Sequence, residues 1–176
     1  MSRDASLRFE LDPELDSDLK SALISLWAEV VNAGGEVGFV PPVDAEDIAP
    51  FAGASFERIS AGSDHLVIAY EDSEPIGFGF LIARPGPLFA HWMTITRLMV
   101  DPARRGRGYG SALLNALHEA ARGLGLEQIH LSVRGGTGTE RFYERHGYVA
   151  ICRIPDAIRV APGDDREEIY MILRLT

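Results

Sequence analysis

One short stretch of the chain alternates arginine and glycine: Arg105-Gly106-Arg107-Gly108-Tyr109-Gly110. It lies between an apolar run that ends before Asp101 and an amphipathic segment that begins at Ser111, which predicts a strand, a loop and a helix in that order. A helix N-terminus has unpaired backbone N–H groups and a partial positive charge. The glycines let an anion reach those groups, and the arginines add positive charge. The stretch therefore predicts a binding loop for a phosphate or a pyrophosphate.

The spacing within this loop excludes two common nucleotide-binding motifs. Neither the Gly-Lys-Ser/Thr ending of the triphosphate loop nor the Gly-x-Gly-x-x-Gly of dinucleotide-binding folds is present. The loop has the pattern Arg-x-x-Gly-x-Gly, and Phe142-Tyr143-Glu144-Arg145-His146-Gly147-Tyr148 follows one strand and one loop after the predicted helix. With the strand Leu98-Met99-Val100 before them, these motifs resemble the coenzyme A loop and the Phe/Leu-Tyr-x-x-x-Gly-Phe/Tyr segment of the Gcn5-related N-acetyltransferase (GNAT) family.

This resemblance covers nearly the whole chain and implies one GNAT-like domain over residues 1–176, with acetyl-CoA as its cosubstrate. The segments 30–42 and 153–175 also resemble the subgroup that includes the tabtoxin-resistance acetyltransferases. A homodimer is an expectation at the level of the family alone. The coenzyme contacts that the resemblance implies are Leu98, Met99, Val100, Arg105, Gly106, Arg107, Gly108, Tyr109, Gly110, Ser111, Phe142 and Tyr143.

Acyl transfer from a thioester to an amine needs a neutral amine, a donor to the carbonyl oxygen and a proton for the departing thiolate. By resemblance, the backbone N–H groups of Leu98 and Val100 contact the pantetheine arm, and the Val100 N–H is the candidate donor to the oxygen. Tyr143 is the candidate general acid, because a phenol with a pKa of about 10 is protonated at pH 7. The alternative role of Tyr143 is that of a packed helix aromatic, like Phe142.

The sequence identifies no direct general base, because three positions depart from the patterns of these families. Thr94 stands where many GNAT members have a glutamate, and Gly136 stands where an asparagine is frequent. Ser132 stands where the tabtoxin-resistance proteins have an acidic residue. Deprotonation of the amine through water would need no protein base.

Three other side chains are candidates for contact with the amine. His91 and His130 lie on the predicted central strands and titrate near neutrality, but the role of ordinary strand histidines fits them better. Glu36, in the loop after the first predicted helix, could bind a substrate ammonium group. Its simpler interpretation is an exposed loop carboxylate.

The prediction is an acetyl-CoA-dependent N-acetyltransferase that transfers the acetyl group directly to a primary amine of a small or amino-acid-like molecule. A protein or peptide N-terminus, or a lysine, is the alternative acceptor. A non-catalytic acyl-CoA-binding module is the alternative from another class of function, and thioester turnover by the purified protein distinguishes it from an enzyme.

Composition excludes several other classes of protein. The net charge of −9 argues against a nucleic-acid-binding surface. No apolar run approaches the roughly 18 residues that span a bilayer, and the N-terminus lacks the apolar core of a signal peptide, so we expect a cytoplasmic protein without membrane contact. The five histidines and the single cysteine lack metal-ligand spacing, so no metal is expected. Cys152 lies in an apolar run and is predicted to be buried.

Hydrophobic periodicity and turn residues predict the elements that position these side chains. Asp12 and Pro13 are typical of a helix N-cap and first helical residue. A polar loop is predicted over residues 158–168. The predicted order of elements is βααβββαβαββ, which indicates an α/β (α+β) fold with a mixed, mostly antiparallel twisted sheet flanked by helices. The strands are expected at residues 7–11, 65–70, 75–83, up to 100, 129–133, 148–154 and 169–175, and the helices from 12 to 34, 45 to 61, 111 to 125 and 139 to 146.

Overall fold

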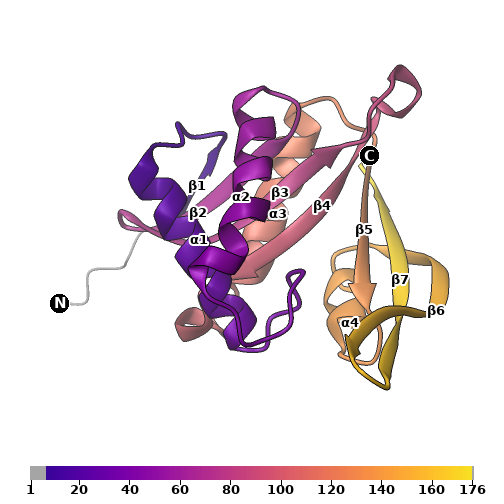
Figure 1. Cartoon of the computed structure of the whole chain (residues 1–176). Coiled ribbons are helices and arrows are strands. Elements are labelled where there is room, and N and C mark those ends of the chain that lie inside the picture. Colours follow the sequence, from indigo (N-terminus) through magenta and orange to yellow (C-terminus); the bar gives the residue numbers. More distant parts are fainter. Residues whose placement is uncertain (1–6, 176) are drawn as a thin grey trace.

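The predicted order βααβββαβαββ is confirmed in the computed structural model, which describes residues 7–175 (Figure 1). The helices are α1 (Ser17–Asn32), α2 (Ala45–Ser60), α3 (Tyr109–Gly123) and α4 (Thr139–Glu144). The strands are β1 (Leu7–Leu11), β2 (His65–Glu71), β3 (Glu74–Ala83), β4 (Trp92–Val100), β5 (Gln128–Arg134), β6 (Val149–Ala161) and β7 (Asp164–Arg174).

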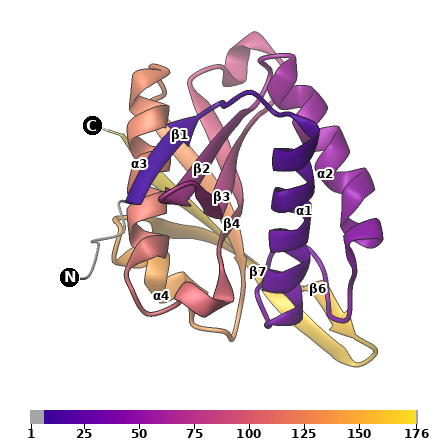
Figure 2. The same cartoon turned by 90° about the vertical axis from the view of Figure 1, so that its left-hand side faces the viewer.

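The strands form one mixed sheet in the order β1-β2-β3-β4-β5-β7-β6. Neighbouring strands are antiparallel except β4 and β5, which are parallel. Parallel neighbours need a crossover connection, and α3 provides it. Helices α1 and α2 cover one face of the sheet, and α3 covers the other (Figure 2). The predicted fold class is therefore confirmed.

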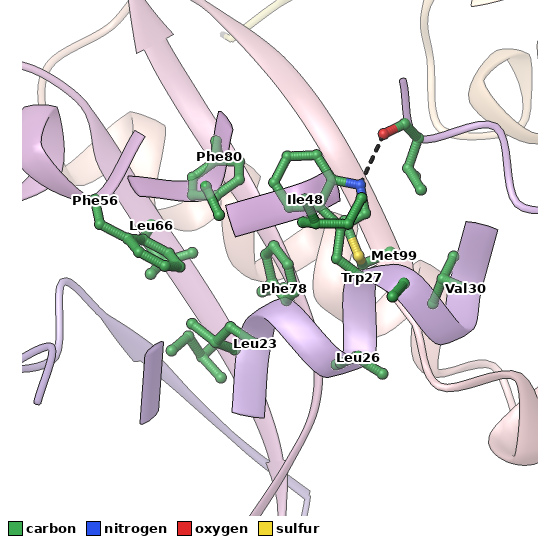
Figure 3. Close-up of a cluster of buried hydrophobic side chains, with 14 of the residues drawn as sticks. Leu23, Leu26, Trp27, Val30, Ile48, Phe56, Leu66, Phe78, Phe80 and Met99 are labelled. Carbon is green, nitrogen blue, oxygen red and sulfur yellow. Dashed lines mark hydrogen bonds between the residues drawn. The ribbon is translucent and has the colours of Figure 1, made fainter. Parts of the chain in front are cut away.

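Trp27 of α1 is central to the hydrophobic core on the α1 face (Figure 3). Its ring packs edge-on against Phe78 of β3, with 6.2 Å between the ring centroids. The indole Nε1–H donates a hydrogen bond of 2.9 Å to the backbone oxygen of Val37. A buried indole N–H needs such an acceptor. The bond fixes the loop after α1 against the core.

Helix α1 begins later than the sequence predicts. Asp16 is the N-cap, and its carboxylate accepts a hydrogen bond of 2.8 Å from the Leu19 N–H. Asp12 has a φ of 50° and instead accepts a hydrogen bond of 2.8 Å from the Leu66 N–H of β2. The prediction of Asp12 as the cap was wrong because aspartate is favoured both in turns and at caps. The contact with β2, which the local sequence does not reveal, decides between the two roles.

The polar loop predicted over residues 158–168 is also wrong. Strands β6 and β7 form a long hairpin through this region, with Ile158 opposite Arg166. Strand β6 is at the edge of the sheet and most of its side chains are exposed, so it lacks the alternation from which a half-buried strand is predicted. Cys152 of β6 is exposed, which corrects the prediction that it is buried.

Gly77 and Gly79 of β3 allow neighbouring elements to approach closely. A Cβ atom on Gly79 would lie 2.8 Å from Cδ1 of Leu117 in α3. A Cβ atom on Gly77 would lie 2.7 Å from the backbone oxygen of Met99 in β4. The side-chain-free face of β3 is therefore filled by α3 and β4.

Candidate active site

Strands β4 and β5 pair only from Trp92 opposite Gln128 to Thr94 opposite His130. They diverge beyond this point (Figure 1), and a cleft of about 910 Å³ opens beside them. The cleft is lined by the loop after α1, the second half of β4, the start of α3, β5, α4 and the β6–β7 hairpin. All the predicted coenzyme contacts line it except Arg107.

Residues 104–111, which we call the anion loop, form one end of the cleft. Helix α3 begins at Tyr109, and Gly108 before it has a φ of 79° and provides no side-chain cap. Within residues 7–175, the N–H groups of residues 106–111 donate to no hydrogen-bond acceptor. A side chain at Gly106 or Gly108 would meet no atom within 4 Å, so glycine there serves the left-handed backbone. The unpaired N–H groups fit a phosphate or pyrophosphate.

The three arginines of the anion loop have different partners. Arg104 is held by three carboxylates, those of Glu71, Glu74 and Asp101. Its hydrogen bond to Glu71 is the main cause that raises the pKa of Arg104, which is therefore a structural clamp. Arg105 donates to the backbone oxygen of Ala33 at 3.2 Å, and the exposed Arg107 lies 3.6 Å from Glu71 Oε1. Arg105 is thus the arginine of this loop that lines the cleft without a carboxylate partner among the described residues.

The backbone N–H groups of Leu98 and Val100 in β4 point toward the gap between β4 and β5. The Asp101 N–H donates to the Ile76 backbone oxygen at 2.7 Å and so faces β3. Val100 is opposite Gly77 in the antiparallel ladder. Since successive N–H groups point to opposite sides of a strand, the Val100 N–H faces away from β3, toward the gap beside β5. The same alternation directs the Leu98 N–H toward that gap.

Tyr143 of α4 is buried and borders the cleft. Its ring packs edge-on against Phe142 at 5.1 Å and against Tyr148 at 5.4 Å between centroids. Burial, and to a smaller extent the charge of Glu36, raises the pKa of Tyr143. The phenol therefore remains neutral around physiological pH and keeps its O–H as a donor. Behind it, the Tyr148 hydroxyl lies 3.0 Å from Nε2 of the buried His118.

Comparison with known protein families identifies the family of this chain. Residues 62–150, just over half of the chain, match the model of the acetyltransferase (GNAT) domain. The chain belongs to the GNAT acetyltransferase family. The matched residues include the divergent part of β4, the anion loop and Tyr143.

Named proteins similar to this GNAT chain include a mycothiol acetyltransferase of Amycolatopsis mediterranei. It is 35% identical over 121 residues, which are 69% of this chain and 34% of that protein. The chain spans between about a quarter and a third of the length of the curated relatives it matches.

Two solved structures share the GNAT fold. One is a Salmonella typhimurium protein assigned as an acetyltransferase and solved with acetyl-CoA, with a TM-score of 0.75 at 17% identity, covering 97% of this chain and 94% of that one. The other is a protein assigned as a phosphinothricin N-acetyltransferase, with a TM-score of 0.77 at 19% identity, covering 97% and 99%.

Acetyl-CoA, the cosubstrate of GNAT acetyltransferases, fits the residues of this cleft. The unpaired N–H groups of the anion loop suit its pyrophosphate, and the inward N–H groups of Leu98 and Val100 suit the amide-rich pantetheine arm. Phe142 lies against the start of α3, since a Cβ atom on Gly110 would be 4.0 Å from its Cζ atom.

His91 and His130 do not line the cleft of this GNAT domain. His91 is exposed, and the ring of His130 stacks on Trp92 with 3.9 Å between centroids. Burial, with the nearby His91, lowers the pKa of His130. The structure therefore supports the interpretation of His130 as an ordinary strand histidine, whereas His91 lies in the turn before β4 and not on a strand.

Glu36 lies in the cleft, so its interpretation as an exposed loop carboxylate is wrong. It is only partly exposed, and its Oε2 accepts hydrogen bonds from the hydroxyls of Thr137 at 3.2 Å and Thr139 at 3.3 Å. Arg134 Nη1 lies 4.0 Å from its Oε1. These contacts hold the carboxylate of the α1 loop against β5 and the start of α4.

Glu168 of β7 is a second cleft carboxylate, which the sequence analysis missed. Its Oε1 accepts a hydrogen bond of 2.7 Å from the hydroxyl of Ser132, and its Oε2 accepts one of 3.2 Å from Tyr170. A carboxylate thus stands beside Ser132, although it comes from the neighbouring strand. The alternation of Glu168 and Tyr170 with the buried Ile169 could have indicated it, but the predicted strand began at Ile169 and left Glu168 in the predicted polar loop.

Other kinds of site find no support in the described part of the chain. Between residues 7 and 175, no three His, Cys, Asp or Glu side chains are grouped in a way that could hold a metal ion. None of the described helices is both long and apolar enough for a membrane span.

Proposed function

We propose that this protein transfers the acetyl group of acetyl-CoA directly to a primary amine of a small-molecule acceptor. One observation carries the proposal: the open N–H groups of the anion loop, the inward Val100 N–H and the Tyr143 phenol border the same cleft. A small acceptor is supported by the similarity to a protein named mycothiol acetyltransferase.

Acetyl-CoA supplies an acetyl group that is activated as a thioester. In this proposal, the Val100 N–H donates to the carbonyl oxygen, which gains negative charge as the amine attacks. The pairing of β3 with β4 holds this donor in place, so its dipole needs no reorganisation during the reaction. The Leu98 N–H, on the same side of β4, helps to align the pantetheine arm.

Tyr143 donates its phenolic hydrogen to the departing sulfur. Its raised pKa keeps the proton on the oxygen until a strong acceptor is present, and the newly formed thiolate is such an acceptor. The edge-on contacts with Phe142 and Tyr148 hold the ring in place at the border of the cleft.

Glu36 and Glu168 act on the amine. Both carboxylates line the cleft, and hydroxyl donors hold both of them in position. A carboxylate attracts the ammonium form of an acceptor and can receive the proton that the amine must lose before it attacks. In this proposal, Glu36 and Glu168 take the place of the glutamate that many GNAT members have at the position of Thr94, which has no basic group at neutral pH.

The test measures release of free thiol from acetyl-CoA with a panel of amines, together with binding of acetyl-CoA by calorimetry. The panel contains amino acids, polyamines, aminoglycosides and peptides. Binding together with thiol release for one class of small amine is the expected result. Release with peptides alone would replace the small acceptor by a protein one. Binding without release would leave an acyl-CoA-binding module, and failure to bind would contradict the assignment of the anion loop.

A further inference from the structure

Arg97 occupies an unusual position in β4. Between Met99 opposite Phe78 and Thr96 opposite Phe80, β4 has one residue more than β3, so Arg97 lies in a β-bulge. Its φ of 56° is in the left-handed region, which is uncommon for arginine. Bulges of this kind redirect a side chain, and strained backbone often marks a functional site.

The Arg97 guanidinium is enclosed by the α1 side of the cleft. Its Cζ atom lies 5.5 Å from the ring centroid of Trp27, over the ring face. The backbone at Gly38 covers it so closely that a Cβ atom there would be 2.7 Å from Cζ. Gly38 has a φ of 97°, so glycine is required for this contact. Arg97 is only partly exposed to solvent, and this burial lowers its pKa.

This cation has no anionic partner in the described residues. No hydrogen bond or ion pair joins Arg97 to any of residues 7–175, and its guanidinium, which lies over the Trp27 ring, lines the cleft. The other cleft arginines on this side each lie beside a carboxylate. Arg159 forms two hydrogen bonds with Asp165, and Arg134 lies 4.0 Å from Glu36, although its buried Nε has no hydrogen-bond partner among residues 7–175. Keeping a partly desolvated guanidinium unpaired costs free energy, which an anionic ligand would recover.

Arg97 lies on the α1 face of the sheet. The anion loop leads into α3, which packs on one face, whereas Trp27 and Gly38 place Arg97 on the α1 face. If the coenzyme enters from the anion loop, the α1 face is left for the acceptor. Glu36 lies in the same loop as Gly38, so a cation and a carboxylate border this part of the cleft together.

We propose that Arg97 binds a carboxylate of the acceptor, so that the substrates are amino acids whose primary amine is acetylated. A guanidinium suits a carboxylate because its N–H groups can donate two parallel hydrogen bonds. Glu36 would attract the ammonium group of the same molecule, and the two opposite charges would fix its orientation. This inference rests on the proposed function for the acetylation step, but the carboxylate site can be tested without turnover.

The experiment compares amino acids with their carboxamides, which keep the amine and lose the negative charge. In the wild type, kcat/KM for the best amino acid should exceed that for its carboxamide by about 10- to 100-fold. In Arg97→Asn this ratio should fall close to one, while the affinity for acetyl-CoA is unchanged. Asparagine is chosen because it tolerates a positive φ better than most residues.

Arg105→Gln is the matched control, since it removes a guanidinium from the anion loop. It should weaken acetyl-CoA binding and leave the ratio of acid to amide unchanged. An equal rate with both acceptors in the wild type, or the same ratio in Arg97→Asn, would overturn the proposal. If no amine releases thiol, the proposed function fails, and the carboxylate site is then tested by calorimetry of amino-acid binding in the presence of CoA. Binding of the panel's amino acids to the wild type that is lost in Arg97→Asn would support the carboxylate site at Arg97. Absence of binding to the wild type would refute it. Circular dichroism confirms that each variant is folded.

Discussion

The two sides of the cleft differ in the part of the chain that they present. The anion loop presents main-chain N–H groups, and glycines keep them open. The α1 side presents charged side chains that come from the α1 loop, β4 and β7: Glu36, Arg97 and Glu168. A backbone donor suits a ligand that never changes, whereas side chains suit a ligand that differs between proteins. In our proposal, the coenzyme therefore binds to the first side and the second side selects the acceptor.

The largest effect should come from Tyr143→Phe, because in our proposal Tyr143 donates the proton to the departing thiolate when the acetyl group passes from the coenzyme to the acceptor. Loss of the proton donor should lower kcat by about 100-fold or more, with little change in the affinity for acetyl-CoA. Steady-state kinetics and calorimetry measure the two quantities. Tyr148→Phe is the control, since it removes a neighbouring buried hydroxyl that does not line the cleft. An equal loss of turnover in both variants would contradict the role of Tyr143.

The buried His118, which lies beside Tyr148, should make the stability of the protein depend on pH. Burial, with smaller effects of Arg122 and His146, lowers the pKa of His118 from 6.5 to about 4. Between pH 6.5 and 4 the unfolded state therefore binds more protons than the folded state. The unfolding free energy is highest above pH 6.5 and decreases as the pH falls toward 4. The expected loss is about 3 kcal/mol of unfolding free energy over this range.

Urea unfolding at several pH values measures this dependence. His118→Gln keeps a hydrogen-bonding side chain beside Tyr148 but does not titrate, so its stability should fall less between pH 6.5 and 4. Parallel curves for the wild type and the variant would show that His118 is not the group responsible.

Gly108→Ala tests the role of the backbone N–H groups of the anion loop in coenzyme binding. At a φ of 79° an added Cβ atom costs about 1 kcal/mol or more. Relief of this strain should shift the N–H groups and weaken acetyl-CoA binding about 10-fold. Gly125→Ala is a matched control at the other end of α3, with a φ of 76° and open space around it. It should lose similar stability without loss of affinity, and equal affinities of the two variants would refute the role of the anion loop.

The smallest effect is expected for Glu36→Gln, because Glu36 is still partly open to solvent. The KM for the amine should rise about fivefold as a screened charge is lost, while the KM for acetyl-CoA stays constant. Initial rates at varied concentrations of each substrate separate the two constants. Glu144→Gln, an exposed carboxylate on α4, controls for the general change in charge. A rise in the KM for acetyl-CoA instead would move Glu36 to the coenzyme side.

The two sides also differ in how well the sequence predicts them. The anion loop could be predicted because its glycines, arginines and helix start are contiguous and have a local physical meaning. Tyr143 could be placed by its motif, and the order of elements followed from periodicity. Glu168 was missed because the last strand was predicted to begin one residue after it, and its contact with Ser132 depends on the pairing of β5 with β7.

Arg97 illustrates the same limit. Its position depends on an extra residue in β4 and on a glycine far away in the α1 loop. Nothing in the neighbouring sequence indicates a bulge. Residues that act together through long-range strand register are therefore the part of a site that sequence reasoning misses.

Recognition through main-chain groups has an evolutionary consequence. Any residue except proline presents a backbone N–H group, so most substitutions in the anion loop leave its donors intact as long as the glycines remain. After gene duplication, a copy could exchange the side chains of the α1 side and explore new amines without first losing its acetyl donor. Divergence within this architecture should therefore accumulate around positions such as Glu36, Arg97 and Glu168, while the glycine spacing persists.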